Sequence, residues 1–182
     1  MKMDTFVALL RGVNIGHKQV AMADLRRGLE AMGLRGVETY LQSGNVVFDA
    51  EGGDAVTLAV AIRARIAADF GHQVDVLVLG CEETARIAAF NPFLSCPGAD
   101  KRWLHATFLM EPSSAAHFES LALPAAEGER AALIDRVVFL CLPNGYGRTK
   151  LSNTFFERAL HTPATTRNWR TVLALAAMCA AR

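Results

Sequence analysis

The sequence predicts an α+β protein that is built from two similar halves. Its 182 residues are 52% apolar and 20% charged, a composition typical of chains that fold around a sizeable core. Runs typical of strands and of amphipathic helices follow one another in the order strand, helix, strand, strand, helix, strand, and much of this order then recurs. We therefore expect one half in residues 1–80 and the other in residues 81–182. A single compact domain and an unrelated two-layer α+β fold are the alternatives.

The first half contains every element of this order. Strands are expected at residues 5–10, 37–42, 45–48 and 74–79. Apolar residues recur every three or four positions in each of the two expected helices, namely Met22, Leu25, Leu29 and Met32, then Leu58, Ile62, Ile66 and Phe70. Gly44 and Asn45 can adopt a positive φ, so they suit the turn of a hairpin between the middle strands. This is the order of a ferredoxin-like unit.

The second half follows the same order less regularly. The expected elements are a helix at 82–90, a strand at 103–110, a helix at 112–121 capped by Ser113 or Ser114, strands at 130–134 and 137–142, and a helix at 152–160. Where the last strand should come, Pro163 and the cap-rich TTRNW predict another helix, with Thr165 or Thr166 as its N-cap. We therefore expect an irregular second ferredoxin-like half that ends in an extra C-terminal helix.

The composition predicts a cytoplasmic protein without a membrane span, a metal or a cofactor. No apolar stretch approaches the roughly 20 residues that cross a bilayer, and the first residues lack the pattern of a secretory signal. Neither the histidines nor the cysteines have the spacing of metal ligands. We expect reduced cysteines and no disulfide. Cys141 and Cys179 should be core residues, Cys81 has no assigned role, and Cys96 lies in a loop without a base that would make it a nucleophile.

The strongest functional signal is the stretch LPNGYGRTKLSN at residues 142–153, which leads from an expected strand into an expected helix. Residues 143–170 carry a net charge of +4 and residues 11–27 a net charge of +3, although the whole chain is only +1. Both segments contain a glycine-bearing loop that precedes a helix. The free N–H groups and the dipole at the start of a helix favour anions. The sequence therefore predicts an anion site at strand-to-helix loops.

The expected ligand contacts are mostly in this stretch. Arg148 and Lys150 would supply charge, Gly145 and Gly147 would let the backbone approach, and Ser152 would complete the cradle. Structural alternatives are open, because glycines serve turns, serines cap helices and asparagines bind their own turns. Glu157 or another acidic side chain could equally compensate Arg148 and Lys150. Trp169 is expected to pack in the core, and Arg170 is a further candidate cation. The complete candidate set is Arg11, Asn14, Asn144, Gly145, Tyr146, Gly147, Arg148, Lys150, Ser152 and Arg167.

Common ligand-binding motifs are missing from the sequence. GYGRTKLS lacks the spacing of a phosphate-binding P-loop, and GVNIG is not a dinucleotide fingerprint. NVVFDA lacks the aromatic pattern of RNA-recognition strands, so nucleic acid is a partner that no motif supports. The sequence pI of about 7.7 also argues against a general nucleic-acid coat. No pair of carboxylates suggests glycoside chemistry.

Five segments together resemble a known family. FVALLRGVNIGHKQVAMADLRRGLEAMG, TYLQSGNVVF, NPF, LCLPNGYGRTKLSN and PATTRNWRTVLALAAM are similar in order and spacing to the bacterial family called domain of unknown function 1697. The similarity runs from about residue 5 to residue 178. It implies a compact cytoplasmic α+β protein with ferredoxin-like halves, and it implies no catalytic residue. His17 falls at a variable loop position of this pattern and is a poor catalytic candidate.

Three functions remain open at this point. The protein could bind a small phosphorylated or carboxylated ligand, as a binding protein or a regulator. It could be an enzyme that acts on such a ligand, with Tyr146, Arg148 or Lys150 polarising it, although no general base is evident. It could also be an interaction or RNA-binding module without catalysis. The ligand and the oligomeric state are not predicted.

Overall fold

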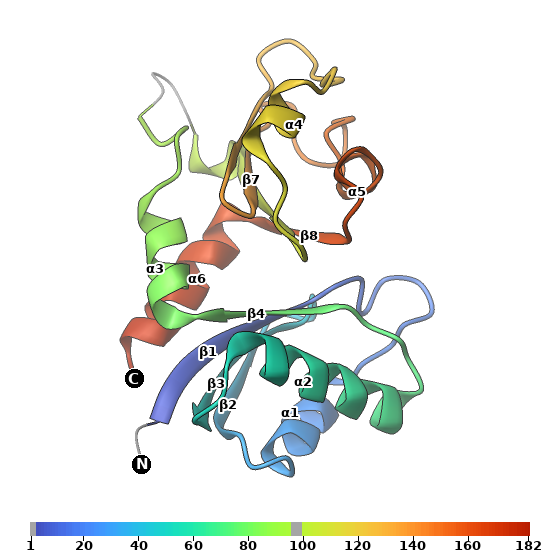
Figure 1. Ribbon diagram of the computed structural model, residues 1–182, viewed down its shortest axis with the longest axis vertical. Coiled ribbons are helices and arrows are strands. Elements are labelled where there is room, and N and C mark those ends of the chain that lie inside the picture. Colours follow the sequence, from blue (N-terminus) through green and yellow to red (C-terminus); the bar gives the residue numbers. More distant parts are fainter. Residues whose placement is uncertain (1–2, 96–99) are drawn as a thin grey trace. The chain divides into compact units, whose positions relative to one another are not determined.

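The computed structural model describes residues 3–95 and 100–182. It contains two four-stranded antiparallel sheets, with strand orders β2-β3-β1-β4 and β6-β7-β5-β8 (Figure 1). The chain divides into two compact units, Met1–Ala88 with Ala174–Arg182, and Ala89–Leu173. The α+β class and the two ferredoxin-like halves are confirmed.

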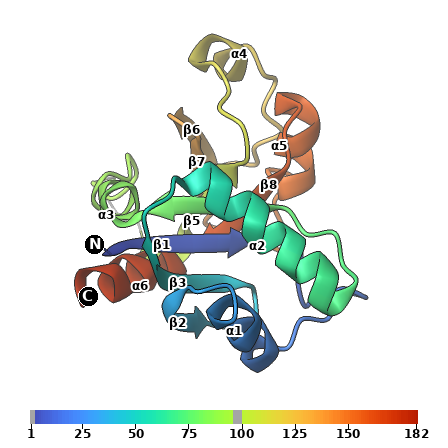
Figure 2. The ribbon, with the colours of Figure 1, turned by 60° about the horizontal axis from the view of Figure 1, so that its bottom comes forward.

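The first unit has the βαββαβ order that the sequence predicts. Its elements are β1 (Met3–Leu10), α1 (Met22–Glu30), β2 (Arg35–Tyr40), β3 (Asn45–Glu51), α2 (Ala55–Phe70) and β4 (Val76–Gly80). β1 lies between β3 and β4 and pairs antiparallel with both. α1 and α2 lie beside each other on one face of this sheet (Figure 1; Figure 2). Alternate residues of β1, namely Phe6, Ala8 and Leu10, join the helices in one apolar core.

The turn between β2 and β3 requires a glycine. Gly44 has a φ of 75°, in the left-handed region that side chains disfavour. A Cβ atom there would lie 2.5 Å from Val13 Cγ2 and 2.7 Å from Leu10 Cβ. Asn45 supports the turn, because its Nδ2 donates a hydrogen bond of 2.8 Å to the carbonyl of Tyr40. The predicted hairpin turn is therefore also a packing contact with the segment that follows β1.

The second unit repeats the order in full. Its elements are the 3-10 helix η1 (Lys101–Trp103), β5 (Leu104–Leu109), α4 (Ala115–Glu119), β6 (Arg130–Ile134), β7 (Val137–Cys141), α5 (Asn153–Leu160) and β8 (Ala164–Asn168). Helices α3 (Cys81–Ala89) and α6 (Trp169–Ala180) complete the chain, and α6 is the predicted C-terminal helix. Ser114 caps α4 by accepting a hydrogen bond of 3.1 Å from the His117 N–H. No helix in the described ranges is both long and apolar enough to cross a membrane.

The sequence prediction was wrong about the last strand. Residues 164–168 form β8, which pairs antiparallel with β5 at the edge of the sheet. Pro163 stands just before this strand, where its missing N–H removes no ladder hydrogen bond. Thr165 and Thr166 are therefore strand residues and do not cap a helix. Asn168 takes the capping role for α6, since its Oδ1 accepts a hydrogen bond of 2.9 Å from the Thr171 N–H.

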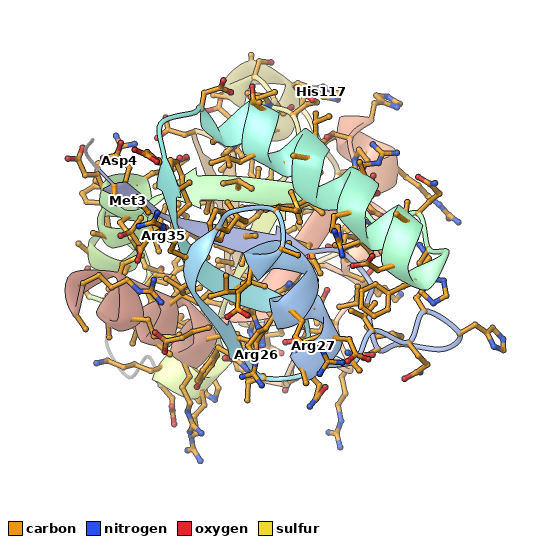
Figure 3. All side chains as sticks on the ribbon, turned by 90° about the horizontal axis from the view of Figure 1, so that it is seen from below. Met3, Asp4, Arg26, Arg27, Arg35 and His117 are labelled. Carbon is orange, nitrogen blue, oxygen red and sulfur yellow. A yellow bond between two sulfur atoms is a disulfide. The ribbon has the colours of Figure 1, made fainter. Side chains whose placement is uncertain are left out.

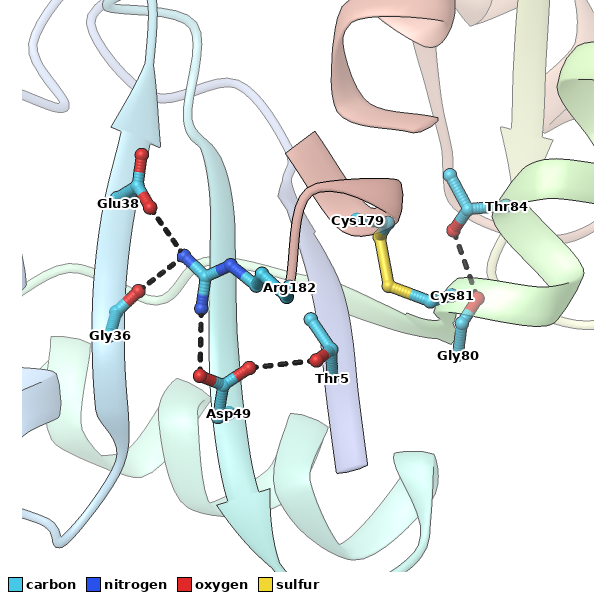
Figure 4. Close-up of a disulfide and its surroundings, with 9 residues drawn as sticks. All are labelled: Thr5, Gly36, Glu38, Asp49, Gly80, Cys81, Thr84, Cys179 and Arg182. Atoms are coloured by element: carbon cyan, nitrogen blue, oxygen red, sulfur yellow. Dashed lines mark hydrogen bonds and ion pairs between the residues drawn. A yellow bond between two sulfur atoms is a disulfide. The ribbon is translucent and has the colours of Figure 1, made fainter. Parts of the chain in front are cut away.

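The expectation of reduced cysteines is also wrong. Cys81, at the start of α3, forms a disulfide with Cys179 near the end of α6, and 98 positions separate them in sequence (Figure 4). Cys141 is a free thiol buried in β7, as predicted. Cys96 lies outside the described residues. The expected cytoplasmic location rested partly on reduced cysteines, and the disulfide removes that support. The location therefore stays a prediction.

The last residue, Arg182, forms ion pairs close to this disulfide. Arg182 lies 2.7 Å from Glu38 Oε1 on β2 and 3.0 Å from Asp49 Oδ2 on β3 (Figure 4). The same Asp49 accepts a hydrogen bond of 2.7 Å from the Thr5 hydroxyl. The disulfide and these ion pairs together hold residues 179–182 to the sheet of the first unit.

Gly44→Ala should lower the free energy of unfolding by about 2–5 kcal/mol, because left-handed backbone costs about 1–2 and overpacking about 1–3 kcal/mol. Gly16→Ala is the matched control, since Gly16 has a φ of 63° but no atom within 4 Å of the added Cβ. Denaturant unfolding of both variants checks this prediction. Equal losses would show that the contact with Leu10 and Val13 contributes nothing.

Replacing Cys81 and Cys179 together with serine should lower the free energy of unfolding by about 2–4 kcal/mol, the usual effect of a disulfide that closes a long loop. Denaturant unfolding with and without a thiol reductant measures the effect. The reductant should destabilise the parent protein and leave the double variant unchanged. A parent protein that is insensitive to the reductant, or that lacks the cross-linked peptide on digestion, would contradict the disulfide.

Candidate functional site

The segment between β7 and α5 in the second unit is held at both ends by buried leucines. Leu142 and Leu151 are both fully buried, and the Leu142 N–H donates a hydrogen bond of 2.8 Å to the Trp103 carbonyl. Between them the chain makes a tight turn in which Gly145 has a φ of 83°. The Gly145 N–H donates to the Leu142 carbonyl at 3.0 Å. Gly145 therefore serves the turn, which is one of the two roles that the sequence allowed.

Tyr146 is the main anchor of this segment. Its hydroxyl accepts a hydrogen bond of 3.0 Å from the Asn153 N–H and donates one of 3.2 Å to Thr166 Oγ1. Thr166 Oγ1 lies 2.8 Å from Thr107 Oγ1 on β5. The tyrosine ring stacks on His105, with 5.2 Å between the ring centroids. Tyr146 thus joins the loop to α5 and to the two neighbouring strands β5 and β8.

The start of α5 has few free donors. Ser152 is its N-cap, as predicted, and its Oγ accepts a hydrogen bond of 3.2 Å from the Phe155 N–H. The Asn153 N–H is used by Tyr146. Within the ranges that the structure describes, the Thr154 N–H has no partner, and it is the free donor of this first turn. Thr154 was not predicted, because its type gives no hint that its backbone would stay unpaired.

Two of the predicted cations remain at the surface. Arg148 and Lys150 are both exposed, and neither side chain has a hydrogen-bond or ion-pair partner among the described residues. Glu157, the one acidic residue near them in sequence, accepts hydrogen bonds from Asn153 Nδ2 at 3.2 Å and from the Ala164 N–H at 2.9 Å. Asn144 and Gly147 are exposed as well, and a Cβ on Gly147 would meet nothing within 4 Å.

A shallow hollow of about 420 Å³ opens beside the first turn of α5. It is lined by the N-cap Ser152, by Thr154, whose backbone N–H is unpaired, and by Arg158 one helical turn further along. Phe155 and Ala159 complete the lining. Arg158, Thr154 and Phe155 were not predicted as site residues. A helical wheel of α5 could have indicated Arg158, since it lies four positions after Thr154 and three after Phe155.

Arg167 is placed differently from the other predicted cations. It is only 7% exposed and donates hydrogen bonds to Thr165 Oγ1 at 2.7 Å and to the Thr166 carbonyl at 3.0 Å. Burial lowers the pKa of its guanidinium to about 10, so it still carries a charge at neutral pH. Its role is therefore tied to the interior and not to the exposed loop.

Arg11 and Asn14 belong to the first unit. Arg11 lies 3.6 Å from Asp75 Oδ2. Asn14 has a φ of 56°, and its side chain hydrogen-bonds both the N–H and the carbonyl of Val20 and the carbonyl of Gln42. Asn14 therefore holds its own loop, as one reading of the sequence proposed. Of the predicted set, the second unit holds the residues of the β7–α5 segment together with Arg167.

His105 should carry less charge than an ordinary histidine. Burial lowers its pKa below the usual 6.5, and a weaker opposing contribution comes from its Nδ1, 3.3 Å from the Trp103 carbonyl. As the pH falls through about 6.5, histidines of the unfolded chain take up protons before the folded His105 does. Lower pH therefore favours the unfolded state.

The free energy of unfolding of the parent protein should drop between about pH 7.5 and 5.5. It should drop less steeply in His105→Gln, which lacks the titrating group. Denaturant unfolding across this pH range checks the prediction, and parallel profiles for the two proteins would contradict the lowered pKa of His105.

Comparisons with known proteins agree with this architecture. The solved structure of the conserved bacterial protein SP0830 from Streptococcus pneumoniae is 24% identical, with a TM-score of 0.78 over 98% of this chain and 99% of that chain. This likeness shows the fold alone. No curated protein matches the chain. The family described as "Protein of unknown function (DUF1697)" matches residues 3–139, most of the length, and agrees with the resemblance seen in the sequence. The chain belongs to this family.

Proposed function

We propose that the protein binds a small phosphate- or carboxylate-bearing ligand of the cytoplasm at the start of α5. The observation that carries the proposal is the pair of exposed cations, Arg148 and Lys150, which have no acidic partner among the described residues. Exposed cations next to the N-terminus of a helix interact unfavourably with its dipole, by about 0.3–1 kcal/mol each, and a nearby anion offsets this. A bound anion would supply that charge and would also accept a hydrogen bond from the free Thr154 N–H.

The geometry around the first turn of α5 supports this proposal. The hollow of about 420 Å³ is large enough for an anionic group with a short organic part. Arg158 is the cation of its lining, and Arg148 and Lys150 belong to the loop that leads into this turn. The hydrogen bonds of Tyr146 to Asn153 and Thr166 restrain the loop before any ligand arrives. A loop that is already ordered loses less entropy on binding.

Binding is favoured over catalysis by the chemistry of the lining. The side chains that line the hollow include no carboxylate and no histidine that could act as a general base. The Tyr146 hydroxyl already has a donor and an acceptor, so it is poorly placed to polarise a substrate. We therefore infer a binding or regulatory role for this site.

Arg148→Ala/Lys150→Ala should abolish the stabilisation of the protein by its anion and leave the free protein folded. A ligand at 100 times its dissociation constant should add about 2.7 kcal/mol to the free energy of unfolding, a shift that thermal unfolding detects easily. The panel should contain inorganic phosphate, sugar phosphates and small dicarboxylates.

The control is Arg26→Ala/Arg86→Ala, which removes the same charge from exposed positions of the first unit; Arg26 lies on α1 (Figure 3). The control should keep the full response to the anion. A panel without any stabilising anion, or an equal loss in both double variants, would refute a site at Arg148 and Lys150.

A further inference from the structure

A larger cavity lies elsewhere in the second unit, where β8 continues into α6. It has a volume of about 540 Å³, within the usual range of small-molecule sites. Four elements line it: η1 through Lys101 and Arg102, β5 through His105, β8 through Asn168, and α6 through Trp169, Arg170 and Leu173. Among these residues, the sequence suggested Arg170 as a candidate cation and Trp169 as a packing residue.

The cavity carries a clear excess of positive charge. Lys101, Arg102 and Arg170 all line it, and the lining contains no carboxylate. Asp100 pairs with Arg102, with its Oδ2 2.8 Å from Nε and 2.6 Å from Nη2. In the described part of the chain, the side chains of Lys101 and Arg170 have no hydrogen-bond or ion-pair partner. Two cations are thus left to meet an anionic group of a ligand.

The walls of the cavity are aromatic and apolar. Trp169 is 1% exposed, and its Nε1–H is buried without a hydrogen-bond acceptor in the described structure. The indole therefore forms the back of the cavity and offers a ligand little free surface. Leu173 adds an apolar surface that is 36% exposed. These walls suit a flat ring better than a fully polar ligand.

His105 adds one hydrogen-bond acceptor. Its Nδ1 lies 3.3 Å from the Trp103 carbonyl, a contact that requires the proton on Nδ1. Burial lowers the pKa of the ring and favours its neutral form. Nε2 is then an acceptor, and no described residue donates to it. A ligand that bears an N–H or amino group would complete this pairing.

We propose that this cavity is a second binding site, for an organic anion that combines a phosphate with a flat ring bearing a hydrogen-bond donor, as nucleoside monophosphates do. Lys101 and Arg170 bind the phosphate, the ring lies against Leu173, and His105 accepts from the ring substituent. The site does not depend on the anion site at α5, because the two share no residue.

Isothermal titration calorimetry with the four common ribonucleoside monophosphates tests this proposal. Adenosine, which lacks the phosphate, and inorganic phosphate, which lacks the ring, serve as partial ligands. At least one monophosphate should bind at millimolar concentration or tighter, and each partial ligand should bind at least about tenfold more weakly, because it lacks the ring or the charge. The indole Nε1–H resonance of Trp169 should move on titration.

Variants separate this site from the one at α5. Lys101→Ala/Arg170→Ala changes exposed side chains only and should weaken binding at least about tenfold, whereas Arg148→Ala/Lys150→Ala should leave it unchanged. His105→Phe should weaken binding more than His105→Gln, which keeps an acceptor. The proposal is overturned if no monophosphate binds, if phosphate alone binds as tightly, or if Lys101→Ala/Arg170→Ala binds like the parent.

Discussion

The hydroxyl of Tyr146 is the interaction on which the organisation of the second unit most depends. It accepts from the first N–H of α5 and donates to Thr166 on β8, while Thr166 lies against Thr107 on β5. Asn153 extends the contacts, since its Nδ2 donates to the Ala164 carbonyl at 2.7 Å. One phenol therefore ties a loop, a helix and an edge strand together. In a partly buried network each of these bonds contributes more than it would in water.

This arrangement explains which groups are left for ligands. The polar atoms of Tyr146, Ser152 and Thr149 are used to hold the β7–α5 segment; Thr149, for example, donates to the buried Glu129 at 2.9 Å. The long cations Arg148 and Lys150 extend beyond the turn and stay in solvent. A structural role of LPNGYGRTKLSN and the anion binding that we propose are thus compatible, because they would use different residues of the same loop.

The strand character of residues 164–168 decides the roles of two arginines. Along β8 the side chains alternate, so Thr166 points to the Tyr146 network and its neighbour Arg167 points to the opposite face, where it is buried. Asn168 then caps α6, and the chain changes from the two-residue repeat of a strand to the helical repeat. Arg170, in the first turn of this helix, lines the larger cavity. If these residues were helical, as the sequence suggested, Thr166 and Arg167 would not face opposite sides.

The sequence by itself determined the features that arise from neighbouring residues. Helix periodicity, the Ser152 and Ser114 caps and the Gly44 turn are each encoded within a few positions. The two ferredoxin-like halves and the order of their elements up to α5 followed from them. The exposed charges of Arg148 and Lys150 were predictable for the same reason. Tertiary structure alone decided the strand β8, the disulfide from Cys81 to Cys179, the burial of Arg167 and the cavity beside Trp169. Each of these depends on partners that lie far apart in the chain, and local propensity carries no information about such partners until the sheets and helices have packed.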